Sequence, residues 1–296
     1  MSGYGKGEVR STDGTTIGYR RWGDGPALIL LHGGMLASQH LTGLAEALAD
    51  DFTVYVPDRR GRGLSGGHGD DYGVEREVED VRALVAETGA NRIFGLSSGG
   101  LVALRTALAV PELERIALYE PPLDAGGAMP LGWLPRYERE LAAGRTGAAL
   151  VTVLKGMEVE PVFGRVPRFV LTPLMAIAVR MGNEPSGDEV PVKALVPTQG
   201  FDIRLVQEMA DTAQEYASVP ASVLLLGGAR SPAYLRAALS RLAAVLPHAR
   251  SVTFPRLDHS GPTNDGDPLA VADALRDFFT ADPGRPGRPG GAGRSR

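Results

Sequence analysis

Short apolar runs alternate with longer segments of helical periodicity along most of this chain. Two of the runs, ALILL at 27–31 and SVLLL at 222–226, are apolar at nearly every position. Such strands are typical of a sheet covered by helices on both faces, and their alternation with helices indicates parallel strands joined by crossover helices. The 296 residues are enough for such a domain with a sizeable core. We therefore predict an α/β fold with a mostly parallel central sheet flanked by helices.

The apolar pattern places the individual elements. Strands are predicted near residues 15–22, 27–31, 53–57, 92–96, 116–119, 222–226 and 251–254. Apolar residues at helical spacing from Val74 to Val85 predict a helix that ends at Gly89. Ser231-Pro232 and Asp267-Pro268 each predict an N-cap followed by proline at the first helical position.

The alternation of strands and helices stops near Leu123 and resumes after Phe201. The stretch between them has helical and irregular patterns with apolar patches such as MPLGWL and PRFVLTPLMAIAVRM. The tail ADPGRPGRPGGAGRSR is rich in Pro, Gly and Arg and cannot form a core. We predict four regions: a first core segment at 1–122, a helical cap or lid at 123–205, a second core segment at 206–280 and a disordered tail at 281–296.

Composition narrows the possible functions. The net charge of −4 gives no reason to expect a nucleic-acid partner. The absence of cysteine excludes disulfides, thiolate chemistry and Cys-ligated zinc. The first twenty residues lack the apolar segment of a secretory signal, and no apolar run reaches the roughly 20 residues that a membrane-spanning helix needs. We expect a cytoplasmic protein without a membrane span, and no motif specifies its oligomeric state.

A serine motif stands at the junction of the strand predicted at 92–96 and the helix predicted to follow it. Gly95-Leu96-Ser97-Ser98-Gly99 matches G-x-S-x-G, in which a sharp turn strains the central residue and glycines on either side let the chain segments pass closely. The register identifies Ser97 as the nucleophile, because Ser98 would need glycine at position 96. Ser98 would instead donate its backbone N–H to an oxyanion hole. The alternative is that both serines only cap the helix.

Two further segments could complete an active site. The strand in LILLHGGMLAS at 28–38 leads into two glycines, so the backbone N–H of Met35 or Gly34 could be the second oxyanion donor. His32 is expected to shape this loop through hydrogen bonds. Of the five histidines, His259 follows the last predicted strand on a loop that leads into the final helix. A neutral imidazole there could accept the serine proton and return it to the leaving group.

Together these segments resemble the α/β-hydrolase superfamily over nearly all of residues 7–280. The segments that carry the resemblance are LLHGG at 30–34, PDRRGRGLS at 57–65, GLSSGG at 95–100, YEPP at 119–122 and LDHSGP at 257–262. The resemblance implies a helical cap inserted after the sixth strand, a Ser-His-acid triad and a structural role for Asp58. It calls for neither a metal nor an organic cofactor, and nothing in Arg59, Arg60 or Arg62 requires a catalytic role.

The acid departs from the common pattern of the family. Many members place an aspartate after the strand that follows the cap, but no carboxylate occurs here between Glu215 and Asp258. Asp258 is adjacent to His259, and neighbouring side chains on an extended segment point apart. Glu120 ends the strand before the cap, where some branches of the family carry a carboxylate, and it keeps the order Ser, acid, His. Glu120 is therefore the predicted acid, with a strand-end salt bridge as its alternative role.

A serine nucleophile predicts acyl transfer from an ester, thioester, lactone or activated amide. Serine instead of aspartate at position 97 argues against the dehalogenase and epoxide-hydrolase chemistry of related proteins. Apolar cap residues suggest a small or medium hydrophobic substrate, although for any one of them packing of the cap against the core is the better interpretation; they are Met129, Leu131, Trp133, Leu134, Phe163, Phe169 and Leu174. The alternatives are a cofactor-free perhydrolase, a carbon–carbon bond hydrolase, and a ligand sensor or interaction protein with little catalysis.

Overall fold

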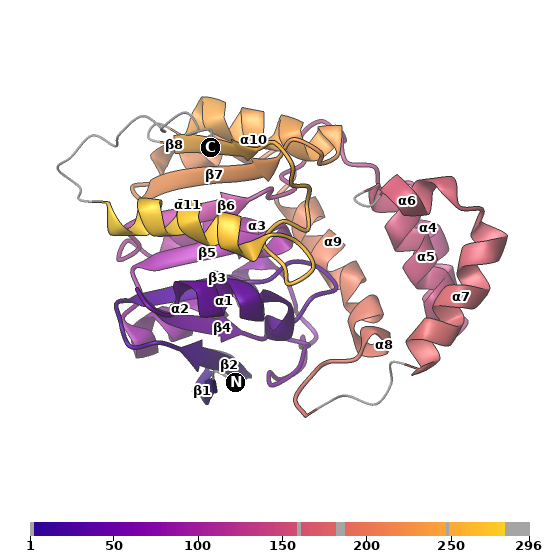
Figure 1. Cartoon of the computed structure of the whole chain (residues 1–296), viewed down its shortest axis with the longest axis horizontal. Helices are drawn as coiled ribbons and strands as arrows, with labels where there is room; N and C mark the ends of the chain where they lie inside the picture. Colours follow the sequence, from indigo (N-terminus) through magenta and orange to yellow (C-terminus); the bar gives the residue numbers. More distant parts are fainter. Residues whose placement is uncertain (1–2, 159–160, 182–186, 247–248, 282–296) are drawn as a thin grey trace, which may run out of the picture.

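A computed structural model of the chain describes residues 3–158, 161–181, 187–246 and 249–281. Its centre is an eight-stranded sheet with the order β1-β2-β4-β3-β5-β6-β7-β8 (Figure 1). The strands are β1 (Gly5–Arg10), β2 (Thr16–Trp22), β3 (Ala27–Leu31), β4 (Thr53–Pro57), β5 (Arg92–Leu96), β6 (Arg115–Tyr119), β7 (Ser222–Gly228) and β8 (Ala249–Phe254). The pairs β1–β2 and β2–β4 are antiparallel and the other pairs are parallel, so the predicted α/β fold class is confirmed.

All seven predicted strands are present, and β1 is the strand that the pattern missed. It lies at the edge of the sheet, where most of its residues face solvent and Val9 alone is buried. An exposed edge strand that contains Gly5 and Gly7 carries neither the apolar run nor the β-branched enrichment by which strands are recognised.

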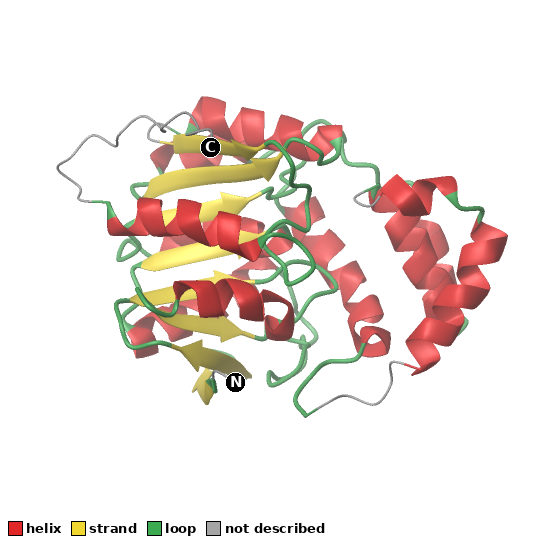
Figure 2. Ribbon diagram, in the orientation of Figure 1, coloured by secondary structure: helices red, strands yellow, loops and turns green. Residues whose placement is uncertain are grey.

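Helices cover both faces of the sheet (Figure 2). One face packs against α1 (Thr42–Leu48) and α11 (Pro268–Thr280), and the other against α2 (Val74–Thr88), α3 (Ser98–Ala109) and α10 (Ala233–Val245). Along β3, Leu28 and Leu30 belong to the first apolar core whereas Ile29 and Leu31 belong to the second. Side chains of a strand alternate between faces, so burial on both faces accounts for the unbroken apolar run.

The predicted helix boundaries are confirmed at two places and wrong at a third. Helix α2 ends at Gly89, which takes a left-handed φ of 66°, and the Asp267 side chain caps α11 by accepting a hydrogen bond from the Ala270 N–H (3.1 Å). The predicted N-cap at Ser231 is wrong, because extended Pro232 occupies the N-cap position and α10 begins at Ala233. The Ser231 hydroxyl is buried without a hydrogen-bond partner among the described residues.

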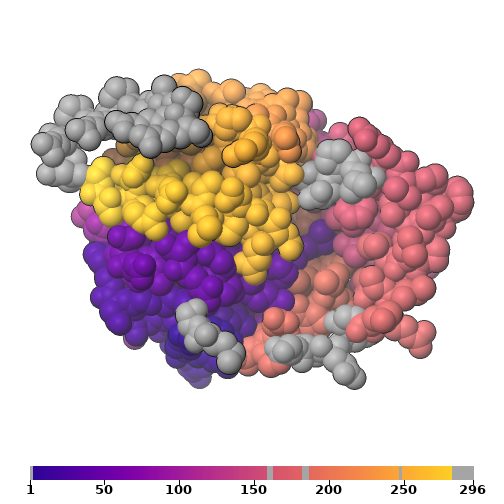
Figure 3. Space-filling model, viewed as in Figure 1, coloured from indigo at the N-terminus to yellow at the C-terminus, as the bar shows by residue number. Residues whose placement is uncertain are grey.

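The described residues between β6 and β7 form helices and no strand. The helices are α4 (Leu134–Ala142), α5 (Thr146–Met157), α6 (Pro161–Arg165), α7 (Arg168–Met181), α8 (Val192–Leu195) and α9 (Gln199–Glu208), with short 3-10 turns at Val196–Thr198 and Ala213–Ser218. We call residues 123–205 the helical segment; it lies beside the sheet core in Figure 3. Helix α9 leads back to the core, where Leu205 and Val206 join the apolar cluster around α3.

No helix within the described ranges is long and apolar enough to cross a membrane, and the apolar stretch at 168–181 forms the 14-residue helix α7. The predicted disordered tail at 281–296 lies outside the described residues except for Ala281.

Candidate active site

Ser97 occupies the tight turn between β5 and α3. Its backbone has φ 54° and ψ −123°, a combination that residues other than glycine rarely adopt. The Ser97 N–H donates to the Tyr119 carbonyl (2.9 Å), which anchors the turn to the end of β6. The Ser97 side chain makes no capping hydrogen bond to α3, so capping of this helix does not account for its hydroxyl.

Glycine is required on both sides of this turn. A methyl group added at Gly95 would lie 2.4 Å from the Gly99 carbonyl oxygen, and one added at Gly99 would lie 2.5 Å from the His32 carbonyl oxygen. Both contacts are with backbone, which cannot rotate away. The glycines of the G-x-S-x-G motif are therefore required because β5, α3 and the loop after β3 pack closely against one another at this turn.

We expect Gly99→Ala to lower the free energy of unfolding by about 1–3 kcal/mol, because the added methyl group overpacks a backbone contact. Gly132→Ala is the matched control, since a methyl group there meets nothing within 4 Å and should change stability by no more than about 0.5 kcal/mol. Urea denaturation followed by circular dichroism measures both values. Equal midpoints for the two variants would contradict the packing argument.

The loop after β3 lies directly against Ser97. A Cβ built on Gly33 would be 3.0 Å from the Ser97 Cβ, and Met35 follows with a left-handed φ of 51°. Gly34, Met35 and Ser98 line the same pocket as Ser97. Ser98 is the first residue of α3, so its N–H has no acceptor within the helix and points where the helix dipole favours negative charge. The backbone of two segments, the loop after β3 and the start of α3, thus borders the pocket at Ser97.

His32 is buried in this loop, and both of its ring nitrogens are occupied. Nε2 accepts the Arg59 backbone N–H (3.1 Å), so Nδ1 carries the proton and faces the Gly33 carbonyl (3.0 Å). Burial, followed by the charges of Arg62 and Arg59, lowers the pKa of His32 well below its usual value. A neutral histidine held on both sides shapes the loop and is not free to exchange protons.

Glu120 and His259 are brought together from different strand ends. Glu120 follows β6 directly, is fully buried and has a left-handed φ of 48°. Its Oε2 lies 2.7 Å from Nδ1 of His259, and its Oε1 accepts the Gly228 N–H (2.7 Å) from the end of β7. The His259 side chain is 13% exposed and lines the same pocket as Ser97.

Asp258 makes its hydrogen bonds to its own loop and to β6, as expected of a residue whose side chain points away from the neighbouring imidazole. Its Oδ1 accepts the Ser260 N–H (2.9 Å), and its carbonyl accepts the Tyr119 hydroxyl (2.6 Å). The first bond lies within the loop after β8, and the second ties this loop to the end of β6. Asp258 therefore stabilises the loop, while Glu120 is the carboxylate that meets the histidine.

The pocket has a volume of about 230 Å³ and opens between the sheet core and the helical segment. Leu154 and Met157 of α5 and Ile203 and Val206 of α9 give it an apolar wall. The amide of Gln199, also from α9, lies in the same wall.

Seven apolar residues between 129 and 174 were predicted to form a hydrophobic substrate face or to pack against the core. Of these seven, Met129 lines the pocket and the other six do not. Phe169 and Leu174 are 80% and 52% exposed, because α7 packs on the outer side of α5 and is separated from the pocket by it. Trp133 packs against the ring of Tyr137 instead.

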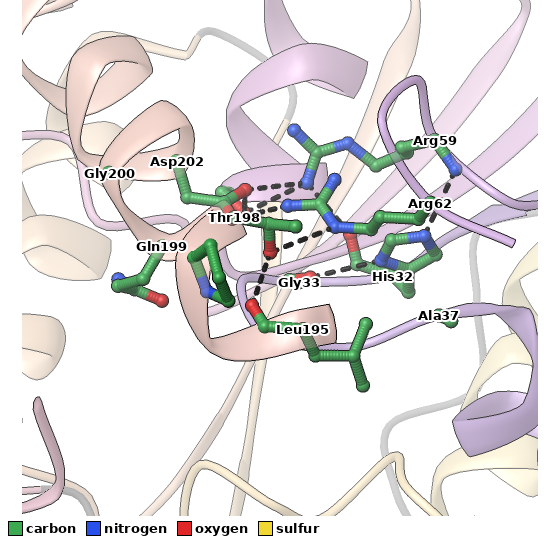
Figure 4. Close-up of polar contacts among 12 residues, drawn as sticks. His32, Gly33, Ala37, Arg59, Arg62, Leu195, Thr198, Gln199, Gly200 and Asp202 are labelled. Carbon is green, nitrogen blue, oxygen red and sulfur yellow. Dashed lines mark hydrogen bonds and ion pairs between the residues drawn. The ribbon is translucent and has the colours of Figure 1, made fainter. Parts of the chain in front are cut away.

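A buried charged cluster beside the pocket was not predicted. Asp202 of α9 accepts from Arg59 Nη1 (2.9 Å) at Oδ1 and from Arg62 Nη2 (2.5 Å) at Oδ2 (Figure 4). Its Oδ1 also accepts from the Ser98 hydroxyl (2.8 Å). Arg59 also makes a two-pronged pair with Glu77 of α2 (2.8 and 3.1 Å). Burial alone would raise the pKa of Asp202, but the charges of Arg62 and Arg59 outweigh it and hold the pKa below its usual value.

Strands β3, β5, β6, β7 and β8 run parallel, so Ser97, Glu120, His259 and the His32–Met35 loop meet at one edge of the sheet. This arrangement is that of an α/β-hydrolase. A model of the alpha/beta hydrolase family matches residues 28–274, and the chain belongs to this family.

Individual relatives agree with this membership. N-formylmaleamate deformylase of Pseudomonas putida is 36% identical over 158 residues, which are 50% of this chain and 58% of the deformylase. The crystal structure of an alpha/beta hydrolase from Sphaerobacter thermophilus has a TM-score of 0.74 at 31% identity and covers 93% of this chain and 100% of that one. An enol-lactonase from Burkholderia xenovorans shares the fold, with a TM-score of 0.68 at 22% identity, over 93% of this chain and 100% of its own.

Proposed function

We propose that the protein is a serine hydrolase that acts by acyl transfer, with Ser97 as nucleophile, His259 as base and Glu120 as acid. The observation that carries the proposal is the 2.7 Å contact between Glu120 and His259 beside a pocket that Ser97 also lines. The strained backbone of Ser97 and its flanking backbone donors support the same assignment.

The reaction follows from these positions. His259 Nε2 takes the proton of Ser97 as its Oγ attacks the substrate carbonyl, and Glu120 holds the proton on Nδ1 and stabilises the imidazolium. The backbone N–H groups of Ser98 and of Met35 or Gly34 receive the negative charge on the carbonyl oxygen. His259 then protonates the leaving group as the carbon–heteroatom bond breaks. Water, deprotonated by His259, hydrolyses the acyl-enzyme and restores Ser97.

The substrate that this site favours is a small or medium hydrophobic ester, thioester or lactone. The apolar wall from α5 and α9 and the volume of about 230 Å³ support such a substrate. We propose that the helical segment at 123–205 is the cap that supplies this wall. The similarity to N-formylmaleamate deformylase adds an N-formyl amide to the candidates.

The test is the intact mass of the protein after incubation with a fluorophosphonate, followed by peptide mapping. We expect one adduct at Ser97 that forms rapidly in the wild type and is lost in His259→Ala. A panel of p-nitrophenyl esters of increasing chain length, a lactone and an N-formyl amide then ranks the substrate classes. A folded wild-type protein that takes no label would overturn the proposal and favour a ligand-binding protein without catalysis.

A further inference from the structure

We propose that Asp202 and Arg59 are positioning residues that hold the two sides of the oxyanion hole at their working separation. This inference rests on the serine-hydrolase function proposed above. The position of α9 against the core then affects the catalytic rate, although neither Asp202 nor Arg59 belongs to the triad.

The first side of the hole is held through Ser98. Its backbone N–H is one proposed oxyanion donor, and its hydroxyl donates to Asp202 Oδ1 (2.8 Å) while accepting from Arg59 Nη1 (3.0 Å). Asp202 lies on α9, 104 positions away in the sequence. The start of α3 is thus fastened to the helix by which the helical segment returns to the core.

The second side is held through the loop after β3. The Arg59 backbone N–H donates to His32 Nε2 (3.1 Å), and its Nη1 donates to the His32 carbonyl (3.3 Å). The same Nη1 lies 2.9 Å from Asp202. One guanidinium nitrogen therefore contacts the loop, the Ser98 hydroxyl and the α9 carboxylate.

Close packing adds to these polar links. A Cβ built on Gly34 would lie 3.2 Å from Asp202 Oδ2 and 2.8 Å from the Gln199 side-chain oxygen, so α9 rests against the loop with no spare space. The two-pronged pair between Arg59 and Glu77 fixes the guanidinium from the opposite side. A shift of α9 would consequently move both oxyanion donors relative to Ser97.

Stability alone does not require this arrangement. Buried ion pairs contribute little net stability, because desolvation offsets their attraction. An oxyanion hole, by contrast, needs donors placed to within a fraction of an ångström of the developing charge. A rigid cluster that contacts both donor segments meets that need.

Three variants test the proposal in the full-length protein. Ser98→Ala cuts the hydroxyl link but keeps the backbone N–H, and Asp202→Asn removes the charge that both arginines share. Arg62→Met is the matched control: Arg62 binds the other oxygen of Asp202, and its remaining bond goes to Thr198 and not to either donor segment. For each variant we would measure kcat and KM on a p-nitrophenyl ester, and Ki for butylboronic acid, whose tetrahedral adduct occupies the oxyanion hole.

We expect kcat to fall about three- to tenfold in Ser98→Ala and about 30- to 100-fold in Asp202→Asn, with KM within about twofold of wild type. The boronate Ki should rise by the same factors. Arg62→Met should unfold at a lower temperature yet keep kcat within about threefold. If Asp202→Asn does not fold, Ser98→Ala and the boronate Ki decide the question.

Unchanged kcat and Ki in Ser98→Ala and Asp202→Asn would overturn the proposal. So would an equal loss of kcat in Arg62→Met, since that loss would come from general destabilisation. A wild type with neither esterase activity nor fluorophosphonate labelling would instead reject the proposed function, and this inference with it.

Discussion

Replacing Ser97 by alanine should lower kcat/KM for an activated ester by about 10⁴- to 10⁶-fold and should abolish the fluorophosphonate adduct. The variant lacks the only atom that forms the proposed acyl-enzyme, while the fold should be unaffected because the Ser97 side chain makes no capping hydrogen bond. Steady-state kinetics and intact-protein mass measure the two effects, and circular dichroism confirms folding.

The neighbouring serine provides the control for this variant. Ser98→Ala removes a hydroxyl one residue away but leaves Ser97 in its strained turn. It should still take a single fluorophosphonate label and lose no more than about tenfold in kcat. A label that persists in Ser97→Ala and disappears in Ser98→Ala would move the nucleophile to Ser98 and refute the assigned register.

Glu120→Gln should lower kcat by about 10³- to 10⁴-fold with little change in KM. The Gly228 N–H, which now donates to Oε1 at 2.7 Å, will select the amide oxygen and turn the amide NH2 toward His259 Nδ1. The imidazole must then carry its proton on Nε2, in the tautomer that cannot accept a proton from serine. Kinetics between pH 6 and 9 should show no recovery, since the defect lies in the tautomer and not in a titration.

Asp258→Asn is the matched control, because it removes a carboxylate adjacent to His259 in sequence. The amide oxygen can still accept the Ser260 N–H, so kcat should stay within about threefold of wild type. A large loss in Asp258→Asn together with an active Glu120→Gln would exchange the roles of the two residues.

Much of the fold was predictable because its signals are local. The apolar runs at β3 and β7 and the helical spacing that ends at Gly89 report burial and backbone geometry residue by residue. The exception within the sheet was β1, whose exposed, glycine-containing edge carries no such signal. The N-cap of α10 was misplaced because the extended backbone at Pro232 took the position assigned to Ser231.

Part of the candidate site could likewise be predicted from local patterns, and part could not. The glycines around Ser97 can be identified from spacing, since a turn this tight excludes a Cβ at Gly95 and Gly99. Which apolar residues of the helical segment face the pocket could not be identified, because α7 is apolar on its exposed side as well as on its buried side. Amphipathic spacing cannot orient a helix that lacks a polar face.

The sequence by itself determined the α/β class, the strained serine turn and a short set of candidates for the base and the acid. Each strand, helix and motif behind these predictions is recognised from residues within a few positions of one another. The family resemblance favoured Glu120 as the acid, but only the tertiary structure decided that Glu120 contacts His259 and that α9 holds Ser98. Glu120 and His259 are 139 positions apart, and Asp202 and Ser98 are 104 apart. Such contacts depend on strand order and on the packing of α9, which are properties of the whole chain and leave no local pattern.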